Sequence, residues 1–169
     1  MPVPPEQRNA PSLPWFAPPR LLLTDALYLA RLATVAPDNR TGRQALLNRA
    51  REEIAEAVLA RPHWGEAWIA RGYVESIRHP GFGETERYAL IRSYLDAPYV
   101  HDAGLWRTAR SLPYWHGFPR STQRLIAWEA LWFLCRDDYQ TKRRLLDLIR
   151  ASPAYRPIFL LYGQRGCRT

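Results

Sequence analysis

The chain has 169 residues, 47% of them hydrophobic and 24% charged, which is the composition of a soluble globular domain large enough to bury a core. Its formal net charge is +8, and its apolar runs fall well short of the roughly 18 residues that a membrane-spanning helix needs. The two cysteines, Cys135 and Cys167, fit no metal-ligand spacing and no disulfide-rich framework. We expect a small apolar helix residue at Cys135 and a free thiol at Cys167, with a disulfide between them as the alternative.

The first twenty residues include seven prolines. Because proline breaks helices and favours the polyproline conformation, we expect residues 1–20 to form an extended arm and residues 21–169 to form one helical domain. The arm lacks the basic start and apolar centre of a signal peptide. The chain as given is therefore expected in the cytoplasm, or in the cell envelope if an N-terminal anchor has been removed.

From residue 22 onward, apolar residues recur with the period of a helix, and no stretch keeps the alternation of a strand. The spacing predicts eight helices, at residues 22–36, 41–61, 64–78, 84–96, 100–111, 119–135, 138–151 and 156–163. The segment SLPYWHGFP between the fifth and sixth is predicted to be a loop. The fourth helix is expected to bury Tyr88, Ile91 and Leu95, and the fifth to bury Ala103, Trp106 and Ala109.

The stretch LARPHWGEAWIARG carries the spacing of the tetratricopeptide repeat (TPR), a helical hairpin of about 34 residues. Pro62 would end one helix, and Trp68 and Gly72 would follow at the aromatic and glycine positions of the next. Phe159 and Gly163 follow Pro153 at the same offsets, whereas the central repeats fit poorly. The sequence therefore predicts an all-α, TPR-like helical-hairpin array, an irregular solenoid of about eight helices.

Motifs of known chemistry are missing. The four histidines have no spacing that would aim two ligands at one metal, and no phosphate-binding glycine loop or nucleophile elbow occurs, so we expect no metal, no cofactor and no catalytic residues. Glu75 and Ser76 match the Glu-Ser pair of the all-helical lytic transglycosylases, but the segment that follows this pair in that family is absent. We expect Glu75 to be a solvated charge, and a glycan-cleaving enzyme is the second alternative function.

Positive charge gathers in the last part of the chain. Residues 1–102 hold twelve arginines and twelve acidic residues, whereas residues 103–169 hold eleven arginines and Lys142 against four acidic residues. Trp106, Trp128 and Trp132 fall on apolar stripes and are expected in the core, while Trp115 is expected to be exposed. The predicted binding residues are Arg107, Arg110, Trp115, Arg120, Arg124, Arg143 and Arg144.

These arginines have too few acidic neighbours in the sequence to be neutralised locally. They would bind a protein partner with an acidic surface or an anionic polysaccharide. A nucleic acid is the second choice of partner, since arginine and aromatic side chains together also bind bases and phosphates.

The order of LARPHWGEAWIARGYVES, YALIRSYLDAPYVHDAGLWRTARSL, a long apolar helix and LLDLIRASP resembles the VpsP-type polysaccharide-biosynthesis accessory proteins. These are small TPR-like bacterial proteins, and most begin with a membrane helix that places the repeats outside the cytoplasmic membrane. The resemblance covers roughly residues 25–163 and implies no catalytic residue. It implies a non-enzymatic scaffold or adaptor in exopolysaccharide biosynthesis or export, and a basic nucleic-acid-binding module is the first alternative.

Overall fold

The computed structural model describes residues 17–35, 40–79 and 81–167. They form the helices α1 (Pro19–Val35), α2 (Arg40–Ala60), α3 (Gly65–Arg78), α4 (Glu84–Asp96), α5 (Gly104–Ser111), α6 (Arg120–Arg136), α7 (Tyr139–Arg150) and α8 (Tyr155–Arg165), with a 3-10 helix η2 (Leu112–Gly117). No strand occurs within these ranges. The prediction of an all-α fold with about eight helices is confirmed, whereas the TPR-like arrangement stays a prediction.

Two local expectations need correction. The arm predicted over residues 1–20 lies mostly outside the described residues, and its end is helical, since α1 begins at Pro19. Proline is tolerated there because the first turn of a helix has no internal acceptor for its missing N–H. The predicted loop between α5 and α6 contains η2, which continues directly from α5.

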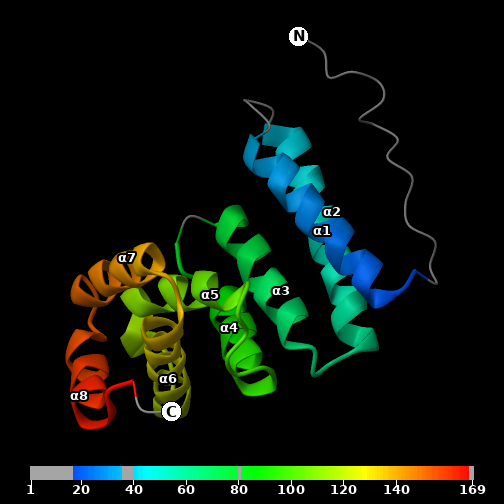
Figure 1. The fold of residues 1–169 in the computed structure, drawn as a ribbon. Coiled ribbons are helices and arrows are strands. Elements are labelled where there is room, and N and C mark those ends of the chain that lie inside the picture. The colour runs from blue at the N-terminus through cyan, green and yellow to red at the C-terminus, as the bar shows by residue number, and fades with distance from the viewer. Residues whose placement is uncertain (1–16, 36–39, 80, 168–169) are drawn as a thin grey trace.

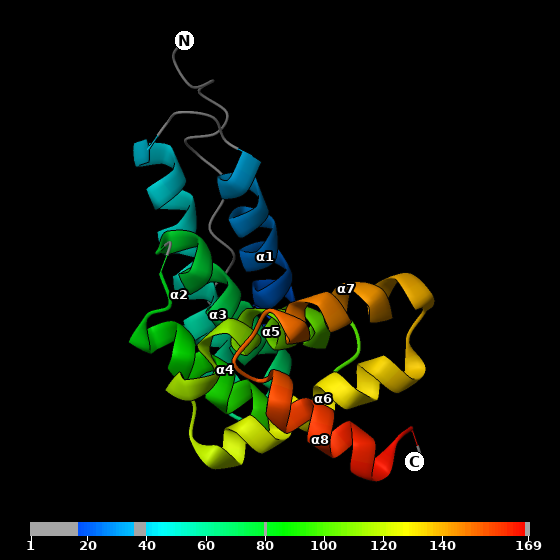
Figure 2. The same ribbon diagram turned by 90° about the vertical axis from the view of Figure 1, so that its left-hand side faces the viewer.

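The helices are arranged as a chain of packed pairs (Figures 1 and 2). α1 lies along α2 at one end of the molecule, α3 packs between α2 and α4, and α6 contacts α4, α5, α7 and α8. α7 and α8 lie at the opposite end from α1 and α2. One hydrophobic cluster joins α1, α2 and α3 with Ala89 of α4, and a second joins the rest of α4 with η2, α6, α7 and α8.

Small residues let the first helices approach closely. Ala26 and Ala30 of α1 and Ala50 and Ala57 of α2 are fully buried, and small side chains at these positions allow the two backbones to approach closely. The helical spacing of these alanines in the sequence is what places them on the facing sides of α1 and α2.

Trp68 and Gly72, which follow Pro62 in the chain, both make close packing contacts. The indole Nε1 of Trp68 donates to the carbonyl oxygen of Pro62 at 2.8 Å, which fixes the turn between α2 and α3. A Cβ atom on Gly72 would lie 3.2 Å from Cδ2 of Leu90, so α3 and α4 approach each other closely at this glycine.

The expected buried faces of α4 and α5 are only partly correct. Tyr88 and Leu95 are each 54% exposed, whereas Ile91 packs partly buried against the second cluster and Leu90 and Tyr94 lie in the core. In α5 the buried residues are Gly104, Arg107, Thr108 and Ser111. The predicted Ala103, Trp106 and Ala109 are partly buried, and Trp106 packs against the second cluster. Both helices bury polar side chains, which a count of apolar positions cannot anticipate.

Cys135 and Cys167 form a disulfide, with their Cα atoms 5.2 Å apart. The expectation of two unpaired cysteines is therefore wrong and the alternative is correct. The bridge ties the end of α6 to the segment that follows α8. Separately, none of the described helices is both long and apolar enough to cross a membrane.

Candidate functional site

Arg107 lies in the core and not on the surface, which corrects its predicted role as an exposed binding residue. Its side chain is fully buried. Nε donates to Oε2 of Glu129 at 2.9 Å, and Nη2 donates to Oε1 of the same carboxylate. Nη1 donates to the carbonyl oxygen of Ser93 at 2.7 Å, and Nη2 also donates to that of Ala97 at 2.7 Å. Four hydrogen bonds of this guanidinium thus join α4, α5 and α6.

The surroundings of this pair complete its hydrogen bonding. The hydroxyl of Thr108 donates to Oε2 of Glu129 at 2.8 Å, and the guanidinium carbon of Arg107 lies 4.2 Å from the centre of the Tyr94 ring. Burial, with the nearby Glu129 carboxylate as a second cause, raises the pKa of Tyr94 above its ordinary value. The cluster is a satisfied polar network inside the second hydrophobic cluster.

Arg110 is also paired. Its Nε donates to Oε1 of Glu86 at 2.6 Å and its Nη2 donates to Oε2 at 3.0 Å, and this hydrogen bonding raises the pKa of Arg110. The guanidinium lies over the rings of Phe82 and Tyr114. The premise that Arg107 and Arg110 lack acidic neighbours is therefore wrong, because their carboxylates come from helices distant in the sequence.

Trp115 was expected to be exposed and is 6% exposed, packed in the second cluster. It sits in η2, and the side-chain amide of Gln123 donates to its carbonyl oxygen at 3.0 Å. The segment that carries it was predicted to be a loop, and the 3-10 turn instead directs this ring inward.

The remaining four predicted residues lie on the surface. Arg120 and Arg124 are exposed one turn apart at the start of α6, and Arg143 and Arg144 are exposed in α7. Among the described residues, no carboxylate lies within 4.0 Å of any of the four. They form two pairs of neighbouring arginines, one on α6 and one on α7.

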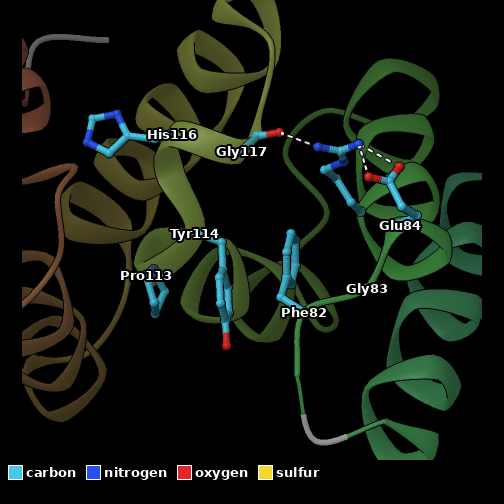
Figure 3. Close-up of a pocket in the computed structure, with 8 residues that line it drawn as sticks. Phe82, Gly83, Glu84, Pro113, Tyr114, His116 and Gly117 are labelled. Carbon is cyan, nitrogen blue, oxygen red and sulfur yellow. Dashed lines mark hydrogen bonds and ion pairs between the residues drawn. The ribbon is translucent and has the colours of Figure 1, made fainter.

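A shallow cavity of about 180 Å³ lies where α4 meets η2 (Figure 3). The Phe82 and Tyr114 rings stack beside it with their centres 4.2 Å apart. Arg87 is the cation that lines it, but Nη2 of Arg87 is bound to both carboxylate oxygens of Glu84 at 2.5 Å and Nη1 donates to the carbonyl oxygen of Gly117 at 3.4 Å. Both terminal nitrogens of Arg87 already have partners. His116 also lines the cavity, but its ring is turned away from Arg87 (Figure 3), so the two side chains do not converge on one ligand position.

Glu75 is 4% exposed, so the expectation that it is solvated is wrong. Both of its carboxylate oxygens accept from Nη1 of Arg78 at 3.3 Å, and it does not line the cavity beside η2. In the part of the chain that the structure describes, no three histidine, cysteine or acidic side chains gather as a metal site would require.

A titratable cluster between α1 and α2 was not anticipated from the sequence. Arg49 donates from Nη2 to Asp25 at 3.1 Å and from Nε to Glu53 at 2.9 Å. Burial, and to a lesser extent the neighbouring Asp25, raises the pKa of Glu53 to about 7, while Arg49 opposes this change. The i,i+4 spacing of Arg49 and Glu53 was a visible signal, but the approach of Asp25 from α1 was not.

Comparison with known proteins gives no relative: no protein-family model, no curated protein and no solved structure matches the chain.

Proposed function

We propose that the chain is a non-enzymatic scaffold or adaptor that binds an anionic partner through its exposed C-terminal arginines. The proposal rests on a contrast among the arginines that were predicted to bind a partner. Arg107 and Arg110 serve the core, whereas Arg120, Arg124 and the Arg143–Arg144 pair are exposed without a carboxylate within 4.0 Å in the described residues. Guanidinium groups left without intramolecular partners suit carboxylate or phosphate groups, which they bind through two parallel hydrogen bonds.

The partner is an acidic protein surface or an anionic polysaccharide, and the resemblance to polysaccharide-biosynthesis accessory proteins favours a place in bacterial exopolysaccharide biosynthesis or export. The Cys135–Cys167 disulfide supports the cell envelope over the cytoplasm, because disulfides persist in oxidising compartments. The burial of Glu75 against Arg78 gives no support to the glycan-cleaving alternative.

The proposal is tested by titrating the whole chain with polygalacturonate, and with neutral dextran as the uncharged polymer. Replacing Arg120 and Arg124 by glutamine, or Arg143 and Arg144 by glutamine, is expected to weaken polygalacturonate binding about tenfold per pair, which corresponds to about 1.4 kcal/mol. Arg150→Gln is the matched control, because Arg150 already pairs with Asp147 at 3.7 Å.

Duplex DNA and single-stranded RNA are titrated in parallel, since the same arginines would bind phosphates. Tighter binding to either, with affinity falling linearly on a logarithmic salt scale, would replace the adaptor by a nucleic-acid-binding module. Equal affinity of the wild-type chain and both double variants for every polymer would overturn the role of these arginines.

A further inference from the structure

α8 exposes the residues that α3 buries. The two helices share a register at an offset of 91 residues, which relates Pro62 to Pro153 and Trp68 to Phe159. Trp68 is 6% exposed and Ile69 is 3% exposed, whereas Phe159 is 59% exposed and its neighbour Leu160 is 66% exposed. The two helices thus carry the same apolar positions, and only in α3 are these positions covered within the described residues.

The glycines of this register show the same difference. Gly72 of α3 faces α4, and a Cβ there would lie 3.2 Å from Leu90. The ring of Trp68 meets Tyr88 of α4 edge-on, with ring centres 5.7 Å apart. Gly163, at the matching position of α8, has no atom within 4 Å of a Cβ built on it. α8 therefore carries the same packing face as α3. In α3 this face is covered by α4, whereas no helix of the described structure covers it in α8.

The opposite side of α8 holds it in place. Ile158 is 1% exposed and packs in the second hydrophobic cluster, with Leu161 partly buried beside it. These two residues correspond in the shared register to Ala67 and Ala70, which are also buried in α3. The exposed face is consequently not the result of a detached helix, because α8 is docked through its other side to α6 and α7.

The charge that α8 itself carries is of one sign. The sequence after Asp147 contains arginines and no acidic residue, and Arg156 lies exposed in the first turn of α8. Tyr155 and Phe159, on either side of Arg156 in the sequence, form an exposed ring pair with centres 5.5 Å apart. A second copy of the same face would bring arginines against arginines, whereas an acidic partner would be attracted.

We infer that the Phe159–Leu160–Gly163 face of α8 receives an amphipathic helix from an acidic protein partner, packed as α4 packs on α3. The partner helix would place a leucine over Gly163 and an aromatic ring beside Phe159, with carboxylates flanking this apolar stripe toward the arginines. This inference rests on the proposed scaffold function and specifies the partner as a protein helix in place of a polymer.

The test supplies such a helix. A copy of residues 84–96, carrying Arg87→Glu and Arg92→Glu so that it holds acidic residues and no basic one, is fused after Thr169 through a flexible glycine-serine linker. The linker raises the effective concentration to about the millimolar range, which compensates for the weak helicity of a short segment. Hydrogen exchange of α8 amides is measured in the fused and the unfused full chain, and exchange is expected to slow at least tenfold in the fusion.

Gly163→Leu is the decisive variant. It should restore fast exchange in the fusion, because a side chain at this position fills the space that the incoming leucine needs, and it should leave the melting temperature of the unfused chain unchanged or slightly higher. Unchanged α8 exchange in the fusion would overturn the inference, as would protection that survives Gly163→Leu.

Membrane binding is the other outcome to exclude. Binding of the unfused chain to phosphatidylglycerol vesicles that is lost in Phe159→Asp would assign the face to a lipid surface and overturn the inference. Polygalacturonate binding by the same fusion is measured separately and tests the proposed function. Failure of the helix-docking inference can therefore be distinguished from failure of the proposed function.

Discussion

Replacing Arg107 by methionine is expected to destabilise the protein strongly while leaving its surface unchanged. The substitution removes four hydrogen bonds, two to Glu129 and one each to the carbonyl oxygens of Ser93 and Ala97. Glu129 would remain buried with the hydroxyl of Thr108 still donating to it. Burying an unpaired carboxylate is costly because its charge has lost both water and its counter-ion.

The expected size follows from comparable sites. Removing one partner of a buried ion pair costs about 3–5 kcal/mol, and in a domain of this length each kcal/mol lowers the melting temperature by about 2–4 °C. Arg107→Met should therefore lower the melting temperature by roughly 6–20 °C. The double variant Arg107→Met with Glu129→Leu should recover much of this loss, because it leaves neither charge of this ion pair in the core.

The measurement is unfolding by urea and by heat, followed by circular dichroism, for the wild-type chain, both single variants and the double variant. Arg120→Met is the control on an exposed arginine, and its effect should stay within about 0.5 kcal/mol. A loss below about 1 kcal/mol for Arg107→Met, or a double variant whose loss equals the sum of the single losses, would refute the reasoning.

Three further predictions concern other parts of the fold. The pKa of Glu53 rises from its ordinary 4.5 to about 7 in the folded protein, so the folded state binds this proton more tightly than the unfolded chain does. Stability is therefore expected to fall as pH rises from 4.5 to about 7. The free energy of unfolding in urea is expected to be lower at pH 8 than at pH 5 by on the order of 1–3 kcal/mol. Glu53→Gln should remove this difference. Reducing the Cys135–Cys167 disulfide, which spans 32 residues, should lower the free energy of unfolding by roughly 2–4 kcal/mol in melts with and without dithiothreitol. Gly72→Leu should cost about 1–3 kcal/mol by forcing α3 from α4, whereas Gly163→Leu should cost nothing in the same melts.

Each of these three predictions would be contradicted by a specific result. A Glu53→Gln effect that is the same at both pH values would show that this carboxyl does not change its proton binding on folding. Melting curves that coincide with and without reductant would mean that the bridge adds no stability. Equal losses for Gly72→Leu and Gly163→Leu would contradict the difference in packing between α3 and α8.

The helices themselves could be predicted because their signals are local. Proline and glycine mark the ends of most of them, and the apolar period identified α1 and α2. The turn at Pro62 was placed correctly for the same reason, since proline, tryptophan and glycine fall within ten residues of one another.

The candidate site was less predictable because its decisive partners are distant in the sequence. Arg107 meets Glu129 across 22 residues and Arg110 meets Glu86 across 24, so a search for acids one helical turn away finds neither. In α5 the fully buried large side chain is Arg107, while Trp106 is only partly buried. The disulfide joins cysteines 32 residues apart and left no spacing signal.

The contacts of Arg107 also constrain the order in which the C-terminal half can assemble. If α5 docked on α4 before α6 arrived, a guanidinium would lose its water without meeting a carboxylate, and Glu129 would face the same cost if α6 came first. Intermediates with one of these helices in place are therefore penalised, and α4, α5 and α6 are bound to open and close together. A cut between α5 and α6 would separate Arg107 from Glu129, so these three helices belong to one folding unit.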